Sequence, residues 1–452
     1  MPVSKLTILA TAAATLGPPL SSAGDWPHYL GPHADTTVRE TGILTTFPDS
    51  GLDLVWSKPA GGGYSSPAVT SDRVFLMDRV ADPYQPGEIN GNPNFIRAHI
   101  PGSERVSALD ATNGDTIWTH RYNCPYSTAF PYATGPRCTP TVDADRVYTL
   151  GAEGNLFCLS TSDGKILWSR DFKKDYALKI PEWGCAAHPL VHGDQLIGIV
   201  GGEGTTVVSF DKTTGEENWR ALSSPAPGYC PPTIATIHGL EQLIVWHGKA
   251  VVSLDPENGT TNWSQELKPA YGMSIGAPRV YRDLVFAMGY NGVSATIKVA
   301  PDNRSADLVW GPDLRKGVAG VFNTAHLSPT GHIYSAGRNQ IFRCIDIHTG
   351  NRLWESDIPL KNATGNGSRH WSSAFTFHHP PSGHTFIYND HGELISTKLT
   401  PQGYTEVSRT RLIPPTHKVG HRTLVWSAPA FANRHVFVRN DSEIRCYNIA
   451  AP

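Results

Sequence analysis

The segment LFCLSTSDGKILWSRDF, from Leu156 to Phe172, joins two short apolar runs through a polar turn that contains Gly164. Two such runs around a glycine-containing turn are typical of a β-hairpin. The chain repeats the pattern, and the copies are VSALDATNGDTIW ending at Trp118, VVSFDKTTGEENW at Trp219, VVSLDPENGTTNW at Trp263 and FRCIDIHTGNRLW at Trp354. Repeats of roughly 40 to 50 residues indicate a propeller or a solenoid.

Three marks recur in each unit and allow the units to be counted. A proline opens a strand at Pro67, Pro140, Pro189, Pro232, Pro278, Pro329 and Pro429, and Phe375 stands in its place in one further copy. A small residue precedes the turn at Ala108, Cys158, Ser209, Ser253, Thr296, Cys344, Ser396 and Cys446. The unit closes on Trp118, Trp168, Trp219, Trp263, Trp310 or Trp354, with Val407 in the weakest copy.

The last unit has no closing strand, and the segment GLDLVWSKP around Trp56 near the N-terminus supplies one. We therefore predict an all-β, eight-bladed propeller of four-stranded antiparallel blades over residues 52–452, with the N-terminal strand completing the last blade. Such closure leaves no sheet edge exposed at the seam. One tryptophan per blade can fill the space between neighbouring sheets while its N–H reaches a backbone carbonyl.

The segments outside the repeat suggest where the protein works. Residues 1–23 carry Lys5, a short apolar stretch and small residues, which predicts a secretory signal and a periplasmic or secreted protein. That stretch is too short to span a membrane. Residues 24–51 form an extended N-terminal segment, and 78–104 reads as a loop insertion in the first blade, a surface loop in preference to a lid. With 38 basic and 40 acidic side chains, the composition argues against nucleic-acid binding, and we expect a monomer.

The LD-x-x-T-G-x-x-x-W repeat resembles the tryptophan-docking motif of the pyrroloquinoline-quinone-type eight-bladed propellers. The stretches DWPHYLGP, GPRCTPTVDADRVYTLGAEGNLFCL and PGYCPPTI also resemble secreted members of planctomycete-type bacteria. The superfamily holds quinoprotein alcohol dehydrogenases and non-catalytic relatives, such as the propeller lipoprotein of the bacterial outer-membrane assembly machine. The resemblance covers nearly the whole mature chain and implies the fold, whereas function depends on sites placed on that fold.

The sequence lacks the marks of quinoprotein chemistry that the resemblance implies. There is no vicinal cysteine pair to cover the quinone, no C-x-x-C-H haem motif, and no segment on which the Ca²⁺ ligands or the catalytic Asp can be placed. We therefore expect no cofactor and assign no catalytic or metal-binding residue. Quinone with Ca²⁺ is expected only if the chain is a dehydrogenase with a degenerate site.

Seven cysteines are present. Cys158, Cys344 and Cys446 occupy the small-residue position and are predicted to be buried free thiols. Four others, at Cys124, Cys138, Cys185 and Cys230, lie in or near loops that lead into a blade. In an oxidising compartment two of them could form a disulfide, and Cys124 with Cys138 is the pair nearest in sequence.

The loops that connect the last strand of one blade to the first strand of the next, called connecting loops below, vary most in sequence. In a propeller all of them emerge on one face beside the central channel. They would bring together Tyr64, Arg137, Trp183, Tyr229, Tyr271, His326, Arg369, His370, Trp371, His421 and Trp426. Such aromatic and cationic side chains can line a ligand pocket, or they can fill the channel and bond to one another. The pair Asp390 and His391 reads as a turn in preference to a carboxylate–histidine site.

Three functions of different classes fit these observations. The first is a non-catalytic binding or protein-interaction scaffold, whose partner is an unknown protein, small molecule or polymer. The second is a quinone-dependent alcohol or polyol dehydrogenase with a degenerate site. The third is a propeller that binds or acts on a carbohydrate or another polymer through the aromatic channel mouth.

Overall fold

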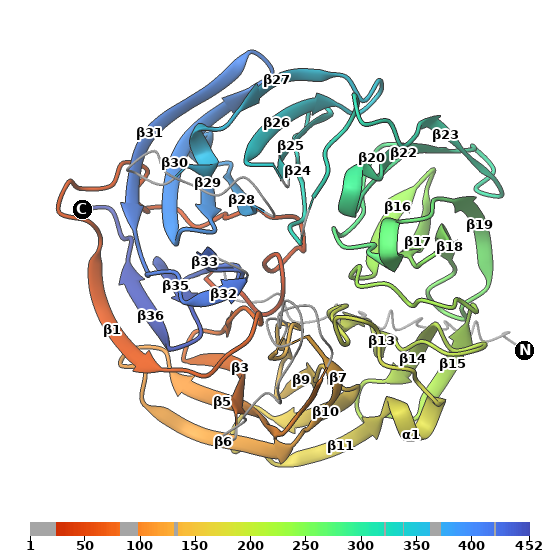
Figure 1. Cartoon of the computed structure of the whole chain (residues 1–452), viewed down its shortest axis with the longest axis horizontal. Coiled ribbons are helices and arrows are strands. Elements are labelled where there is room, and N and C mark those ends of the chain that lie inside the picture. Colours follow the sequence, from red (N-terminus) through yellow and green to blue (C-terminus); the bar gives the residue numbers. More distant parts are fainter. Residues whose placement is uncertain are drawn as a thin grey trace, which may run out of the picture.

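A computed structural model describes residues 24–81, 98–130, 134–320, 322–337, 339–361, 372–419 and 422–452. Eight four-stranded antiparallel sheets stand around a central channel (Figure 1). The predicted all-β, eight-bladed propeller is therefore confirmed. No helix in the described part of the chain is long and apolar enough to cross a membrane.

In blades 1 to 7 the strands run in sequence order from the channel to the rim. Blades 1 to 4 comprise β2 (Ala68–Val69), β3 (Arg73–Ala81), β5 (Gly102–Asp110) and β6 (Thr116–Asn123); β8 (Thr141–Asp143), β9 (Arg146–Leu150), β10 (Asn155–Ser160) and β11 (Ile166–Asp171); β12 (Leu190–His192), β13 (Gln195–Ile199), β14 (Val207–Asp211) and β15 (Glu217–Ala221); β16 (Thr233–Ile237), β17 (Leu240–Trp246), β18 (Ala250–Leu254) and β19 (Thr261–Glu266).

The other four blades follow the same plan. They comprise β20 (Arg279–Tyr281), β21 (Leu284–Met288), β22 (Ser294–Val299) and β23 (Ala306–Trp310); β24 (His326–Leu327), β25 (His332–Gly337), β26 (Ile341–Asp346) and β27 (Arg352–Ser356); β28 (Ala374–His379), β29 (His384–Asn389), β30 (Glu393–Thr400) and β31 (Gly403–Arg411); β34 (Ala430–Ala432), β35 (His435–Arg439), β36 (Glu443–Asn448) and β1 (Asp53–Pro59).

A few elements lie in the loops. They are the hairpin β32 (His417–Val419) with β33 (Arg422–Leu424), the pair β4 (Ala98–Ile100) with β7 (Tyr126–Ala129), helix α1 (Phe172–Tyr176), and the 3-10 turns η3 (Ala270–Gly272), η4 (Tyr290–Gly292) and η5 (Ile358–Leu360).

In seven blades the small residue lies directly opposite the closing tryptophan on the neighbouring strand, whereas in blade 7, which has no such tryptophan, Ser396 pairs with Ser408. Cys158 pairs with Trp168, and Cys344 pairs with Trp354. In both blades the register shifts by one position immediately after this pair, which marks a β-bulge. A small side chain here leaves room for the indole ring of the facing residue.

Each tryptophan also contacts the next blade. The indole N–H of Trp118 donates to the carbonyl of Thr161 at 2.8 Å, and that of Trp310 donates to Ile347 at 2.8 Å. Trp263 differs, because its N–H donates to the side chain of Gln242 at 2.8 Å. These hydrogen bonds satisfy a buried donor while the ring fills the space between two sheets.

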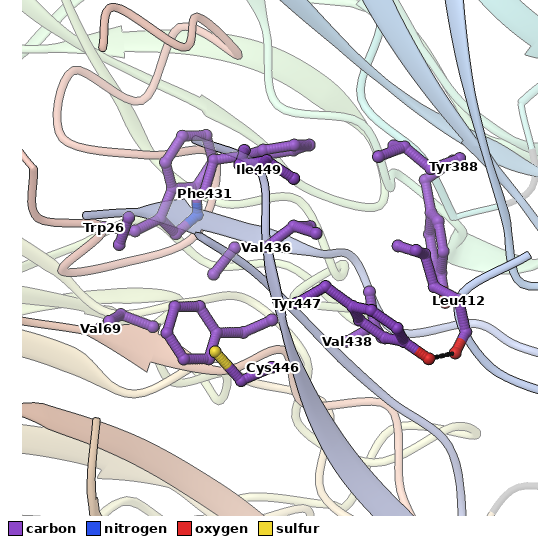
Figure 2. Packing of buried hydrophobic residues seen from close by; sticks show 14 of the residues in the cluster. Trp26, Val69, Tyr388, Leu412, Phe431, Val436, Val438, Cys446, Tyr447 and Ile449 are labelled. Atoms are coloured by element: carbon purple, nitrogen blue, oxygen red, sulfur yellow. Dashed lines mark hydrogen bonds between the residues drawn. The ribbon is translucent and has the colours of Figure 1, made fainter. Parts of the chain in front are cut away.

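The ring closes at blade 8, as predicted. Strand β1 pairs antiparallel with β36, from Asp53 opposite Asn448 to Pro59 opposite Glu443. A large hydrophobic core surrounds this seam and combines side chains of blades 7 and 8 with Trp26 of the N-terminal segment (Figure 2). In the same view the hydroxyl of Tyr447 donates to the carbonyl of Leu412.

The N-terminal segment, residues 24–51, crosses the channel. Its backbone pairs with Val69 of blade 1 and with His378 of blade 7, at 2.7 and 2.8 Å. The guanidinium of Arg279, on the opposite side of the ring in blade 5, donates to the carbonyls of Ala34 and Asp35 at 2.8 and 2.6 Å. Figure 1 shows the red trace of this segment reaching the centre of the ring. The segment therefore obstructs the channel on the side opposite the connecting loops.

Two sequence-based expectations need correction. Residues 78–104 are not simply a loop, because β3 continues to Ala81 and β5 starts at Gly102, while β4 pairs with β7. The disulfide that the sequence allowed between Cys124 and Cys138 is not formed, since both are free and buried. Their thiols contact different groups, the side-chain oxygen of Asn155 and the carbonyl of Ala187.

The prediction for the three cysteines at the small-residue position is confirmed. Cys158, Cys344 and Cys446 are free and fully buried. Asp390 and His391 lie in the turn between β29 and β30, as expected.

Candidate functional site

A cavity of about 450 Å³ opens on the face that carries the connecting loops. Six of the predicted site residues line it, and these are Tyr64, Arg137, Trp183, Tyr229, Tyr271 and Trp426. The structure thus favours a pocket over a channel filled by side chains. These residues come from the connecting loops of blades 1, 2, 3, 4, 5 and 8, so the cavity lies on the axis of the ring.

The floor of the cavity comes from the N-terminal segment. Tyr29 lines the cavity and stacks on the ring of His188, with 3.9 Å between ring centroids and 7° between planes. Burial lowers the pKa of His188 to about 3, and its Nδ1 accepts a hydrogen bond from the backbone N–H of Thr139 at 2.8 Å. Burial also raises the pKa of Tyr29 to about 12. The floor is therefore an uncharged aromatic surface at neutral pH.

Two clusters of aromatic side chains face the cavity. On one side the ring of Trp183 makes a T-shaped contact with the ring of Tyr229, with 5.9 Å between their centroids, and its centroid lies 6.3 Å from that of Phe130. On the other side Trp426 packs against Phe322 and Tyr64, with centroid distances of 4.4 Å and 5.9 Å between the rings. Flat apolar walls of this kind suit a ligand with ring faces.

Charged and polar groups concentrate near Tyr64. The guanidinium carbon of Arg137 lies 4.7 Å from the centroid of the Tyr64 ring. The Tyr64 hydroxyl lies 2.9 Å from Nε2 of His417, and Nδ1 of His417 lies 2.7 Å from a carboxylate oxygen of Asp441. The wall of the cavity therefore places a cation beside Tyr64, whose hydroxyl is linked to His417 and Asp441, two residues that do not line the cavity themselves.

Comparison with known proteins places the chain in a family. The model of the family described as outer membrane protein assembly factor BamB matches residues 102–356, more than half of the chain. The chain belongs to this family. A search of curated proteins gives no match.

Solved structures show the same fold at low sequence identity. BamB from Moraxella catarrhalis is 15% identical with a TM-score of 0.54, covering 88% of this chain and 97% of that one. Quinohemoprotein alcohol dehydrogenase from Comamonas testosteroni is 13% identical with a TM-score of 0.62, covering 96% and 82%. A europium-containing methanol dehydrogenase is 13% identical with a TM-score of 0.61, covering 92% and 90%. Structural neighbours of this BamB-family propeller thus include both an assembly factor and dehydrogenases.

The described residues do not fit the metal that accompanies quinone chemistry. Ca²⁺ takes six to eight oxygen ligands, several of them carboxylates. Among the described residues that line the cavity, Glu182 is the single carboxylate. No group of three His, Cys, Asp or Glu side chains suited to a metal ion occurs within the described ranges.

The remaining predicted site residues do not all reach the cavity. His326 is buried in β24, where its Nδ1 lies 3.2 Å from the hydroxyl of Thr36, so its assignment to the channel mouth is wrong. Arg369, His370, Trp371 and His421 lie outside the described residues, and their place in the site stays a prediction.

Sequence reasoning missed two residues of the cavity. Tyr29 belongs to a segment without a repeat, and His188 was passed over beside the strand-opening Pro189. It also missed His417, which does not line the cavity but contacts the Tyr64 hydroxyl from the connecting loop that leads into blade 8. No sequence signal marks this contact, because the two residues are 353 positions apart.

Proposed function

We propose that the protein is a periplasmic or secreted binding propeller that holds a small molecule, or one unit of a polymer, in the cavity at the connecting-loop face. The observation that carries the proposal is a concave cavity with aromatic walls and a floor supplied by the N-terminal segment. Pockets of this size and composition are the usual sites of ligand binding. We further propose that this work does not involve quinone chemistry.

Binding of the anionic aromatic dye 1-anilinonaphthalene-8-sulfonate tests the proposal. We expect one saturable site per chain, and Trp183→Ala should weaken binding roughly 30-fold, the loss of about 2 kcal/mol typical of a buried aromatic anchor. Lys165→Ala is the control, because Lys165 is exposed in a turn on the opposite face. Equal effects of the two variants would contradict the proposed site.

A second measurement separates binding from dehydrogenation. The wild-type protein is mixed with pyrroloquinoline quinone, Ca²⁺ and a primary alcohol, and reduction of a redox dye is followed. We expect no alcohol-dependent reduction. Turnover would replace the binding proposal with a quinone-dependent dehydrogenase.

A further inference from the structure

Three side chains form a continuous hydrogen-bonded chain at the seam between blades 8 and 1, and the first of them, Tyr64, lines the cavity. Asp441 lies in the turn between β35 and β36, His417 is the first residue of β32, and Tyr64 lies in the connecting loop that precedes β2. The contacts are 2.7 Å from Asp441 to Nδ1 of His417 and 2.9 Å from Nε2 to the Tyr64 hydroxyl. Three separate segments of the chain converge to make this arrangement.

Asp441 fixes the orientation and the tautomer of His417. Burial alone would raise the pKa of Asp441, but the hydrogen bond from His417, the charge of buried Arg439 and the backbone N–H of Gly63 together lower it. The ionised carboxylate accepts the Nδ1 proton of His417. In the neutral ring Nε2 is then an acceptor, so the Tyr64 hydroxyl donates to it.

Tyr64 is placed to lose that proton. Its ring lines the cavity, its hydroxyl lies 2.9 Å from Nε2 of His417, and the guanidinium carbon of Arg137 lies 4.7 Å from the ring centroid. Two other tyrosines of the cavity have different surroundings. Burial raises the pKa of Tyr229. Tyr271 is 73% exposed, and its hydroxyl has no hydrogen-bond partner among the described residues.

We propose that Tyr64 is the catalytic acid–base group of the cavity, that His417 and Asp441 position and activate it, and that the substrate is a carboxylate-bearing sugar of a polymer. This goes beyond ligand binding and rests on the cavity being the ligand site. The aromatic walls provide stacking surfaces for a sugar ring, and Arg137 supplies positive charge next to Tyr64. A carbon–hydrogen bond beside a carboxylate is the acidic position of such a sugar.

The reaction class is β-elimination, and its atoms balance without a co-reactant. Tyr64 passes its proton to Nε2 of His417, and the phenolate takes the proton from the carbon beside the sugar carboxylate. The electron pair of that carbon–hydrogen bond forms a carbon–carbon double bond as the adjacent bond to the leaving sugar oxygen breaks. Tyr64 then gives the proton it took from carbon to the leaving oxygen, His417 returns its proton to Tyr64, and Tyr64 ends as the neutral phenol.

Labelling with phenylmethanesulfonyl fluoride tests the relay without any substrate. The Tyr64 oxygen forms a bond to sulfur, fluoride leaves, and the phenol proton goes to His417. Mass spectrometry at pH 8 should locate the label on Tyr64 at least tenfold faster than on Tyr271, although Tyr271 is the more exposed. His417→Gln should remove that advantage, and Asp441→Asn should reduce it. Faster labelling of Tyr271, or an unchanged rate in both variants, would overturn the relay.

The pH profile separates activation from a structural role. Among the described residues, the charged and titratable groups that interact with Tyr64 or its partners include Arg137, His417, Asp441 and Arg439. In the wild type the labelling rate should already be near its plateau at pH 8. In His417→Gln it should rise only towards pH 10, the ordinary pKa of a phenol. Parallel profiles would show that the histidine merely holds the loop.

Polygalacturonate, alginate and hyaluronan are the probes for the substrate class. With at least one of them the wild type should produce the ultraviolet absorbance of an unsaturated uronate, and Tyr64→Phe should lose at least 100-fold of that rate. Binding of 1-anilinonaphthalene-8-sulfonate to the wild type is measured in parallel, and this binding without product separates failure of the chemistry from failure of the site. Absence of product from all three polymers would overturn the assigned substrate class.

Discussion

At the scale of single residues, the contact between a tryptophan and a glycine explains why the hairpin repeats so strictly. Gly164 has a φ of +70°, and a methyl group added to it would lie 2.5 Å from the ring of Trp118 in the preceding blade. Gly215 stands in the same relation to Trp168. The glycine therefore serves both the turn and the packing between blades, since only hydrogen fits beneath the indole.

A pair of alanine substitutions separates these two roles. Gly164→Ala should destabilise the protein by about 2 to 4 kcal/mol, because a left-handed backbone and an overpacked contact both oppose it. Gly193→Ala is the matched control, since Gly193 has a φ of +55° but nothing within 4 Å of the added methyl group. It should cost only the backbone contribution of about 1 to 2 kcal/mol. Equal shifts in urea unfolding would show that packing under the indole contributes nothing.

At the scale of elements, the N-terminal segment does more than precede the ring. It joins blades on opposite sides of the channel and supplies Tyr29 to the cavity. Arg279 anchors its middle by donating to two backbone carbonyls. Removing these donors takes a hydrogen bond from two half-buried carbonyls, at a cost of up to about 1 to 3 kcal/mol.

Limited proteolysis can test this anchor. Arg279→Met should accelerate cleavage between residues 30 and 40 while the propeller itself resists the protease, because the segment loses its attachment to β20 but the blades keep theirs. Arg304→Met, on an exposed turn of the same blade, should behave as the wild type. Unchanged cleavage in Arg279→Met would mean that the segment is held mainly by its apolar contacts.

The propeller ring and the candidate site differ in how far the sequence predicts them. Blade number and strand order could be predicted because each blade is a local repeat, in which Cys158 and Trp168 are neighbours across one hairpin. Closure could be predicted although β1 and β36 are far apart in sequence, because the repeats leave one strand missing from the last blade and one unassigned strand around Trp56. The floor and the relay could not, because they join distant segments. Arg279 and Ala34 are 245 positions apart, and Tyr64 and His417 are 353 apart. The prediction that His326 lies at the channel mouth was wrong for the same reason, because its ring contacts Thr36 of the distant N-terminal segment on the other side of the channel.

At the scale of the whole molecule, closure of the ring and obstruction of its channel create buried polar sites between blades. His326 is one of them, with a ring centroid 5.2 Å from that of His378. Burial, together with the charges of His378 and Arg279, lowers the pKa of His326 to about 3. The native protein therefore keeps this histidine neutral under conditions in which an unfolded chain would protonate it.

The sign of the resulting pH dependence follows directly. Between pH 6.5, the ordinary pKa of histidine, and about pH 3, the unfolded state binds a proton that the native state does not. Acidification through this window should therefore lower the free energy of unfolding, and His326 should contribute at most about 1.4 kcal/mol per pH unit. Below the window both states carry the proton, and the contribution no longer changes.

Urea unfolding at pH 7, 5.5 and 4 can isolate this contribution. His326→Gln should be less stable than the wild type at pH 7, because the contact with Thr36 is altered, but its stability should fall less steeply on acidification. Thr36→Ala removes the same contact and keeps the histidine, so it should retain the wild-type slope. If His326→Gln and the wild type lose stability in parallel, His326 takes up its proton over the same pH range in the native and unfolded states, and the packing between the N-terminal segment and blade 6 must accommodate that charge.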